Sequence, residues 1–335
     1  MSTLSVLVPN YNHGQFVERT LRDFLHQTRR PDAVVVLDDA STDESTEVLH
    51  RIAAEEPRVR VVHNERNLGA VATMDRLLRM ADTDYVYLGG ADDRVHPELF
   101  ERALNLLEAN PRAGLCSSLC WIIDEGDRVK GKLDSGVVTD RPGYLPPDRV
   151  AEELLRRSAS WMVTNGLIWK REALVQAGGF RLELGPAADS VAAMVIALRN
   201  GACFIPERLS SWRRRSDGYS ASVSADTEAA RQVIQACVHA MKGDFAGDFP
   251  AQFPDRWARE EMARNELMAA ERRHLEQRER WETPAFNGPL RSLVALLATR
   301  GSQLLLLAKI VRVRHSHGLP AREGVLRFWR GWDAG

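Results

Sequence analysis

The chain has 335 residues, of which 44% are hydrophobic and 27% are charged, a composition typical of a globular protein with a sizeable core. A formal net charge of -1 excludes the strong positive field that favours nucleic acid, so we expect no nucleic-acid partner. No apolar run approaches the ~18–20 residues that a membrane-spanning helix needs.

Apolar strands alternate with helices through the first 110 residues. Runs of apolar and β-branched residues predict four strands, at 4–8, 33–37, 59–62 and 85–88. An amphipathic helical pattern follows each of them, and the fourth extends from about 97 to 109. This alternation is typical of a parallel sheet that is covered by helices on both faces.

The pattern becomes irregular after residue 110. Three strands are expected there, at 115–123, 166–169 and 202–205, and one helix is expected at 187–200. A turn at 124–127 and a loop rich in Gly and Pro at 137–147 interrupt them. We therefore expect a single mixed sheet within residues 1–220, followed by a separate helical segment.

Two adjacent carboxylates, Asp92 and Asp93, follow the fourth predicted strand directly after Gly89 and Gly90. The carboxyl ends of parallel strands are where open α/β sheets bind ligands. Adjacent carboxylates repel each other unless a cation or hydrogen-bond donors hold them, and Mn²⁺ or Mg²⁺ can do so while also binding phosphates. A solvated loop that caps a helix is the alternative interpretation of this pair alone.

Four short motifs, each weak alone, occur in order along the first 100 residues. They are residues 6–12 (VLVPNYN), 36–43 (VLDDASTD), 67–69 (NLG) and 90–93 (GADD). Together with a later Gly-Gly-Phe and an acidic helix start, they make the chain resemble a family 2 glycosyltransferase over residues 3–220. The resemblance implies an α/β fold: a GT-A type, Rossmann-like nucleotide-binding mixed sheet flanked by helices, here with a helical C-terminal extension.

The resemblance also implies a division of the chain. Residues 1–110 would form the nucleotide-sugar-binding half of the GT-A domain, 111–224 its acceptor-binding half, and 225–335 the helical extension. Within the extension, residues 285–315 alternate leucines with basic residues. This pattern favours either a peripheral contact with an anionic membrane or a helix that covers the protein's own core, and both remain open.

The resemblance assigns five positions to the donor. Pro9 and Tyr11 would lie beside the nucleotide, with the tyrosine ring against the base. Asp39 would accept a hydrogen bond from the base, typically uracil. Asp92 would contact the ribose or a metal-bound water, and Asp93 would be the direct metal ligand.

Three further positions complete the implied site. Asp189 matches the acid that deprotonates the acceptor hydroxyl, although an acid at a helix start is also common for dipole reasons alone. An arginine run stands where the family often has Arg-x-His, so a histidine metal ligand is missing. Arg213 and Arg215 would instead hold diphosphate oxygens in bidentate fashion, unless the run is simply solvated.

The chain departs from the family pattern at three other positions. Gly90 replaces a first acid, Met74 stands where an arginine is usual, and Ala188 replaces the acid before Asp189. These departures leave a catalytically weak nucleotide-sugar-binding module open as an alternative. A nucleotidyltransferase is the second alternative. Such enzymes usually have a basic Gly-rich loop after the first strand, whereas residues 9–14 of this chain contain neither Lys nor Arg.

We therefore expect an inverting, metal-dependent transferase. It would move a sugar from a nucleotide diphosphate donor to a glycan or a lipid-linked acceptor in bacterial cell-surface polysaccharide or glycan synthesis. The four cysteines form no C-x-x-C pair, and the first eight residues are too short and uncharged for a signal peptide. We expect a cytoplasmic location, at the inner face of the cell membrane.

Overall fold

The computed structural model describes most of the chain, with gaps. The described residues are 2–133, 136–157, 161–215, 218 and 227–282. Contacts between residues divide the chain into two units, Met1–Tyr219 with Ala236–Pro254 and Ser220–Gln235 with Asp255–Gly335. All predicted site residues belong to the first unit, and the predicted boundaries of the two halves and the extension stay predictions.

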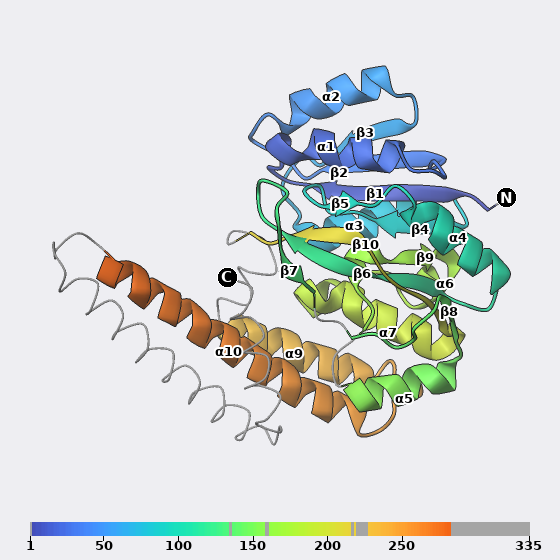
Figure 1. Cartoon of the computed structure of the whole chain (residues 1–335), viewed down its shortest axis with the longest axis vertical. Helices are drawn as coiled ribbons and strands as arrows, with labels where there is room; N and C mark the ends of the chain where they lie inside the picture. Colours follow the sequence, from blue (N-terminus) through green and yellow to red (C-terminus); the bar gives the residue numbers. More distant parts are fainter. Residues whose placement is uncertain (1, 134–135, 158–160, 216–217, 219–226, 283–335) are drawn as a thin grey trace. The chain divides into compact units, whose positions relative to one another are not determined.

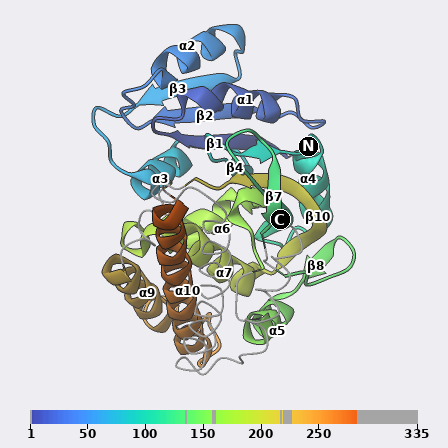
Figure 2. The ribbon, with the colours of Figure 1, turned by 60° about the vertical axis from the view of Figure 1, so that its left-hand side comes forward.

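Ten strands of the first unit form one sheet, with the main order β3-β2-β1-β4-β9-β6-β10-β5 (Figures 1 and 2). Its first half consists of β1 (Leu4–Asn10), β2 (Ala33–Asp38), β3 (Val59–His63) and β4 (Tyr85–Leu88). These four strands pair in parallel, as their sequence pattern predicts.

The other strands make the sheet mixed. They are β5 (Arg94–Val95), β6 (Leu115–Ile123), β7 (Val129–Lys132), β8 (Gly143–Leu145), β9 (Ile168–Lys170) and β10 (Ala202–Arg213). Strand β9 runs antiparallel to both β4 and β6, and so joins the two halves, while β10 runs parallel to β6 and antiparallel to β5. The prediction of a single mixed sheet is confirmed.

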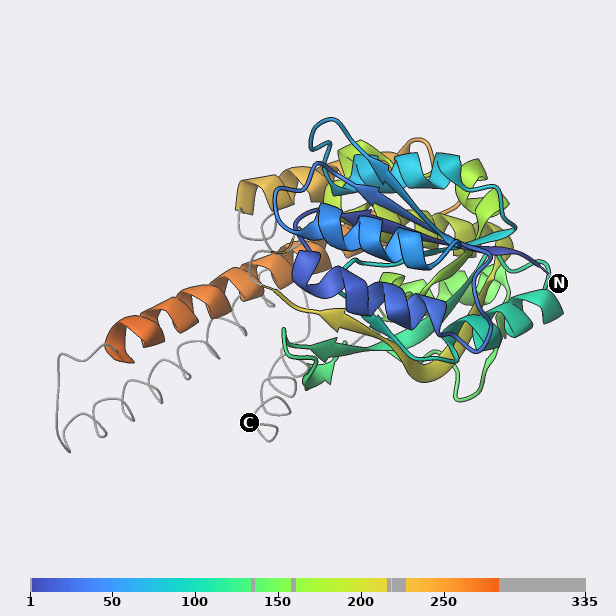
Figure 3. The ribbon, with the colours of Figure 1, turned by 90° about the horizontal axis from the view of Figure 1, so that it is seen from above.

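Helices cover both faces of this sheet (Figure 3). One face carries α1 (Gly14–Leu25), α2 (Ser45–Glu55) and α4 (Leu99–Ala109). The other carries α3 (Ala70–Met80), α6 (Arg171–Gln176) and α7 (Ala188–Asn200). Helix α5 (Pro147–Arg157) packs on α7, and two 3-10 turns, η1 (Thr164–Gly166) and η2 (Leu182–Ala187), connect these elements.

An aromatic cluster packs against the end of β4. The rings of Phe24 and Phe100 lie 5.6 Å and 5.1 Å from the ring of Tyr87, and all three side chains are buried. A Cβ atom on Gly89 would lie 2.5 Å from Phe24 Cζ, which is closer than packed carbons approach. Glycine at this position therefore avoids a clash with the cluster where β4 ends.

Strand β10 is longer than the sequence pattern predicts. The sequence pattern predicts a strand over 202–205, and Pro206 follows it. The strand instead continues to Arg213, with register shifts against β6 on both sides of Arg208. A bulge accommodates a proline that lacks an N–H donor, and the continued strand carries Arg213 to the end of β4.

The C-terminal segment contains two described helices, α9 (Thr227–Lys242) and α10 (Phe253–Glu282). Their presence agrees with the predicted helical character of the extension. None of the helices that the structure describes has both the length and the apolar character needed to cross a bilayer. The predicted membrane contact at 285–315 lies outside the described residues.

Candidate functional site

The loops after β1 and β2 form one connected surface at the carboxyl edge of the sheet. The side-chain oxygen of Asn12 accepts a hydrogen bond from Thr42 N at 2.8 Å, and the backbone N–H of Asn12 donates to Ser41 Oγ at 2.9 Å. Asn12 and Ala40 both adopt left-handed backbone conformations, with φ of 55° and 60°. Such strain in non-glycine residues persists where the surroundings fix it, often at a binding site.

Two nucleotide-binding predictions fall on this surface. The side chain of Tyr11 is 42% exposed, so its ring is accessible to a ligand. Pro9 is the second-last residue of β1, is half-buried and pairs with Leu37 of β2. Tyr11 is therefore exposed one residue after the end of β1, and the stacking of its ring on a base stays a prediction.

The two acids after β2 have different partners. Asp38 accepts hydrogen bonds from Asn10 Nδ2 at 2.8 Å and from Ser41 Oγ at 2.6 Å, so it links the ends of β1 and β2. Asp39 is 3% exposed and holds the turn at Asn67-Leu68-Gly69. Its Oδ1 accepts from Asn64 Nδ2 and Leu68 N, and its Oδ2 accepts from Gly69 N at 2.9 Å. Since each carboxylate oxygen has two lone pairs, Oδ2 retains capacity for one more donor.

The acid pair lies at the end of β4, and its two members differ in exposure. The side chain of Asp92 is 17% exposed and lies 3.7 Å from His13 Nε2, whereas Asp93 is 3% exposed. Asp93 Oδ1 accepts a hydrogen bond from Arg213 N at 2.8 Å, and its Oδ2 accepts from Asn165 Nδ2 at 2.6 Å. A Cβ atom on Gly90 would lie 2.6 Å from Asp93 Oδ2, so the glycine makes room for this carboxylate.

The charge on this pair is only partly compensated by the protein. Burial and the nearby charge of Asp92 raise the pKa of Asp93 to about 7, despite the opposing hydrogen bonds from Arg213 and Asn165. Within the described residues, no three or more His, Cys, Asp or Glu side chains cluster as metal ligands. The pair fits a divalent cation that takes one or two carboxylates from the protein and its other ligands from diphosphate and water.

The η1 turn connects the acid pair with Asp189. Asn165 donates to Asp93, while the neighbouring Thr164 lies beside Asp189, where its hydroxyl opposes the rise in the pKa of that acid. The Asn165 carbonyl accepts a hydrogen bond from Tyr87 Oη at 2.7 Å, which fixes the turn to β4. Two acids from distant parts of the sequence therefore lie beside adjacent residues of one short turn.

Asp189 lies in the first turn of α7, which begins where the sequence predicts. Its Oδ1 accepts a hydrogen bond from Ser190 N at 2.6 Å. Burial raises the pKa of Asp189 above its ordinary value, although hydrogen bonds from Thr164 and Ser190 oppose the shift. A carboxylate with a raised pKa is a stronger proton acceptor, as a general base requires.

Arg213 is buried, and its described contacts are with other parts of the protein. Its side chain is 1% exposed, and its guanidinium stacks 4.6 Å from the centre of the Phe16 ring. Its Nε donates to the carbonyl oxygen of Asp92 at 2.7 Å, and its other nitrogens donate to the Asp124 carbonyl and the Asp127 carboxylate. These hydrogen bonds fasten the Asp92–Asp93 loop, and the contact of Arg213 with a diphosphate stays a prediction.

Arg215 lies two residues beyond, after β10 ends, and is half-buried. Its guanidinium lies 5.3 Å from the centre of the Phe16 ring, on the side chain that Arg213 also contacts. The structure therefore brings Arg215 to the same edge of the sheet as the acid pair. Its contact with a diphosphate stays a prediction.

Sequence reasoning missed three residues that contact the predicted site. Asn165 and Asp127 belong to no motif, and no local signal identifies them. His13 lies in the loop after β1, within one of the motifs' flanks but outside the predicted site residues. Because β1 pairs with β4, the loops that follow these strands lie side by side, and this adjacency was the available signal for His13.

Comparisons with known proteins agree with this geometry. The family model "Glycosyl transferase family 2" matches residues 5–182, more than half of the chain. The uncharacterized glycosyltransferase YibD of Escherichia coli is 29% identical over 178 residues, which cover 52% of this chain and 50% of that protein. The chain spans about one third to two thirds of the length of curated relatives that it matches.

Two solved structures share the fold. TarS from S. aureus, in complex with UDP-GlcNAc, has a TM-score of 0.59 and 16% identity, over 93% of this chain and 83% of that one. The mannosyltransferase PcManGT from Pyrobaculum calidifontis, in complex with GDP-Man and Mn2+, has a TM-score of 0.53 and 20% identity, over 94% and 87%. The chain therefore belongs to glycosyl transferase family 2 and has the GT-A fold.

Proposed function

We propose that this protein is an inverting, metal-dependent glycosyltransferase that moves a sugar from a UDP-sugar donor to an acceptor hydroxyl. The observation that carries the proposal is the η1 turn, where Asn165 contacts Asp93 and Thr164 contacts Asp189. One turn thus holds an acid pair suited to a cation and a carboxylate suited to a base. Displacement of a nucleoside diphosphate by a hydroxyl needs both groups.

The donor would bind across the loops after β1, β2 and β4. The exposed ring of Tyr11 would stack on the base, and the remaining lone pair on Asp39 Oδ2 would accept a hydrogen bond from a base N–H. Uracil offers such a donor, and so does guanine. TarS in complex with UDP-GlcNAc and PcManGT in complex with GDP-Man support a nucleotide sugar as the donor class.

The cation would be Mn²⁺ or Mg²⁺, held by Asp93 as the direct ligand and by Asp92 directly or through water. When bound, it neutralises the charge that develops on the departing diphosphate. Arg215, near the same edge of the sheet, would bind diphosphate oxygens. The protein's own part is to hold the Asp93 carboxylate in place through the Arg213 N–H and the Asn165 amide before a ligand arrives.

The reaction would be a single displacement. The acceptor oxygen forms a bond to the anomeric carbon while the bond from that carbon to the diphosphate oxygen breaks. The electron pair of the broken bond leaves with the nucleoside diphosphate, and the acceptor proton passes to Asp189. Attack opposite the leaving group inverts the anomeric configuration, and no covalent sugar–enzyme intermediate forms.

The acceptor would be a glycan or a lipid-linked sugar in bacterial cell-surface polysaccharide or glycan synthesis. The sugar transfer would take place in the cytoplasm, at the inner face of the membrane. Cys116, Cys120, Cys203 and Cys237 are buried and form no disulfide within the described residues, which supports a reducing compartment. Residues 285–315 would supply the membrane contact.

The proposed function is tested with the full chain and a panel of UDP- and GDP-sugars. We expect hydrolysis or transfer with at least one donor in the presence of Mn²⁺ or Mg²⁺, and none after chelation with EDTA. The anomeric configuration of the first product, read by NMR before mutarotation, should be opposite to that of the donor. Retention of configuration, or activity that is indifferent to EDTA, contradicts the proposal.

A further inference from the structure

The tip of the β6–β7 hairpin carries an aspartate in an unusual backbone conformation. Asp127 has φ of 64°, in the left-handed region that non-glycine residues rarely adopt. The turn around it is closed by Asp124, whose Oδ1 accepts hydrogen bonds from Gly126 N and Arg128 N, both at 3.0 Å. The hairpin therefore holds the Asp127 side chain in one defined direction.

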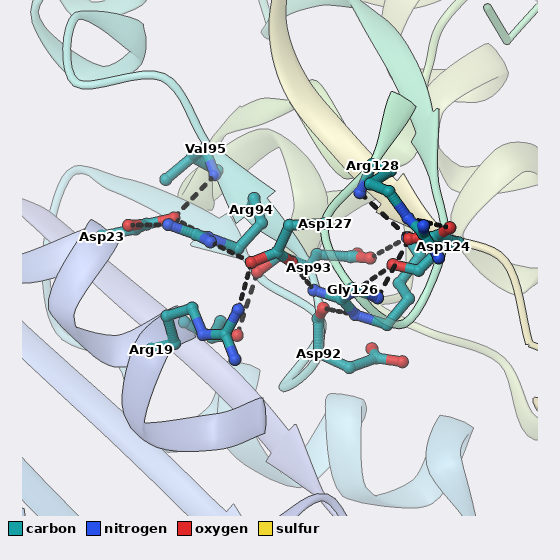
Figure 4. Close-up of polar contacts among 12 residues, drawn as sticks. Arg19, Asp23, Asp92, Asp93, Arg94, Val95, Asp124, Gly126, Asp127 and Arg128 are labelled. Carbon is teal, nitrogen blue, oxygen red and sulfur yellow. Dashed lines mark hydrogen bonds and ion pairs between the residues drawn. The ribbon is translucent and has the colours of Figure 1, made fainter. Parts of the chain in front are cut away.

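Three arginines from three different elements converge on the Asp127 carboxylate. Its Oδ2 accepts hydrogen bonds from Arg19 of α1 and from Arg94 of β5, and Figure 4 shows both side chains turned toward it. Its Oδ1 accepts from Arg213 Nη2. Burial opposes ionisation, but the hydrogen bonds from Arg213 and Arg19 outweigh it and lower the pKa of Asp127, so the carboxylate is charged at neutral pH.

Arg213 depends on this carboxylate more than the other two arginines do. Its side chain is 1% exposed, compared with 51% for Arg19 and 29% for Arg94, so solvent cannot compensate its charge. A buried cation that loses its counter-charge is strongly destabilised in its position. The Asp124 carbonyl, its other hairpin partner, carries no formal charge.

Arg213 also makes the contacts that shape the acid pair. Its backbone N–H donates to Asp93 Oδ1 at 2.8 Å, and its Nε donates to the Asp92 carbonyl at 2.7 Å. A displaced guanidinium would release the Asp92 carbonyl and pull on the backbone that holds Asp93. The hairpin tip and the acid pair are thus connected through one buried side chain.

We propose that Asp127 is a positioning residue for the donor site: it fixes Arg213, and Arg213 fixes the Asp92–Asp93 loop. The inference rests on the proposed function in one respect, that this loop binds a metal–nucleotide complex. Asp127 touches neither the donor nor the cation itself. The β6–β7 hairpin, which lies outside the recognised motifs, would then determine how tightly the donor binds.

The test compares binding and turnover in an Asp127→Asn variant of the full chain. Asparagine has the same shape and tolerates the left-handed backbone, so the substitution removes mainly the charge. Loss of a charge-assisted hydrogen bond to Arg213 should weaken binding of Mn²⁺–UDP about tenfold, measured by calorimetry. At saturating donor and metal, kcat should change less than KM, because the reacting groups are still present.

Glu207→Gln provides the matched control. Glu207 is a carboxylate on β10 that pairs with Arg102 and does not contact Arg213 in the described structure. Its neutralisation should leave Mn²⁺–UDP affinity unchanged even where it lowers the melting temperature. A general loss of stability would reduce affinity in both variants alike, whereas positioning through Arg213 reduces it in Asp127→Asn alone.

A double-mutant cycle tests the route through Arg213. If Asp127 acts through Arg213, the Asp127→Asn/Arg213→Gln double variant should bind Mn²⁺–UDP no more weakly than Arg213→Gln alone. Additive losses would overturn the route. If Asp127→Asn does not fold, Asp127→Gly keeps the left-handed backbone and replaces it throughout the comparison.

Failure of the proposed function can be distinguished from failure of the positioning role. If the wild-type protein binds neither Mn²⁺–UDP nor Mn²⁺–GDP, the proposed function is wrong and the positioning role falls with it. If the wild-type protein binds one of these probes and Asp127→Asn binds it equally well, the positioning role alone is wrong. An equal loss in Asp127→Asn and Glu207→Gln also overturns it.

Discussion

Asn165 and Asp93 are 72 positions apart in the sequence, and the Asn165 amide donates a 2.6 Å hydrogen bond to Asp93 Oδ2. The same residue accepts a hydrogen bond from Tyr87 through its carbonyl. Burial raises the pKa of Tyr87 well above its ordinary value, so this hydroxyl remains a donor throughout the physiological range. Asn165 is therefore fixed on one side by β4 and itself fixes the acid pair on the other.

Replacing Asn165 with Ala should weaken metal-dependent donor binding. The substitution leaves Asp93 Oδ2 without its donor in a buried position, which costs about 1–3 kcal/mol. We expect a lower free energy of unfolding in urea and a weaker Mn²⁺–UDP affinity by calorimetry. Asn110→Ala removes an amide that donates to Leu106 O at the end of α4, and it should change only stability. Unaltered Mn²⁺–UDP affinity in Asn165→Ala would show that this amide does not shape the acid pair.

Separate neutralisation of Asp92 and Asp93 identifies the direct metal ligand. We expect Asp93→Asn to abolish Mn²⁺-dependent nucleotide binding, and Asp92→Asn to weaken it while preserving the Mn²⁺ dependence. The measurement is nucleotide affinity as a function of Mn²⁺ concentration for each variant. Because Asp92 is the more exposed of the two, the reverse result would assign it as the direct ligand and Asp93 as the buried support.

Asp189→Asn should separate catalysis from donor binding. Asparagine keeps the shape of the side chain but cannot accept the acceptor proton at neutral pH. Removal of a general base typically lowers the rate by ~10²–10⁴. Turnover and Mn²⁺–UDP affinity are measured on the same preparation, and affinity should be nearly unchanged. Retained turnover would place the base elsewhere, and an equal loss of both quantities would make Asp189 a structural residue.

The same variant should change how stability depends on pH. Since burial raises the folded-state pKa of Asp189, the native state binds more protons than the unfolded chain between the ordinary and the raised pKa. The stability that protonated Asp189 contributes is present below that window and is lost as the pH rises through it. Asparagine does not titrate, so the melting temperature of Asp189→Asn minus that of wild type should increase from about pH 4 upward and then level off. A difference independent of pH would contradict the raised pKa.

Gly89→Ala should destabilise the end of β4. The new methyl group would lie 2.5 Å from Phe24 Cζ in a packed aromatic cluster, and such overpacking costs about 1–3 kcal/mol. Thermal unfolding measures the loss, and a second substitution, Phe24→Leu, should restore part of it. Gly131→Ala on β7 is the matched control, because a Cβ atom there meets nothing within 4 Å. Equal effects at the two glycines would show that the cluster is not tightly packed.

The sequence by itself determined the first half of the fold and the positions of the acids that follow its strands. Residues 1–110 repeat a strand and a helix with clear apolar periods, and parallel strands joined by helices place their carboxyl ends at one edge. The location of Asp39, Asp92 and Asp93 follows from that local pattern. The start of α7 near Asp189 was predictable for the same reason.

Only the tertiary structure decided which side chains hold those acids. Arg213 donates hydrogen bonds to the Asp92 carbonyl, 121 positions away in the sequence, and to Asp127, 86 positions away. Both contacts depend on the continuation of β10 past Pro206. A proline normally ends a strand prediction, and only the pairing of β10 with β5 and β6 shows that a bulge absorbs it. Asn165 likewise acquires its role from the antiparallel pairing of β9 with β4. Local periodicity encodes an element's type and boundaries, whereas contacts between distant elements depend on how the whole sheet is assembled.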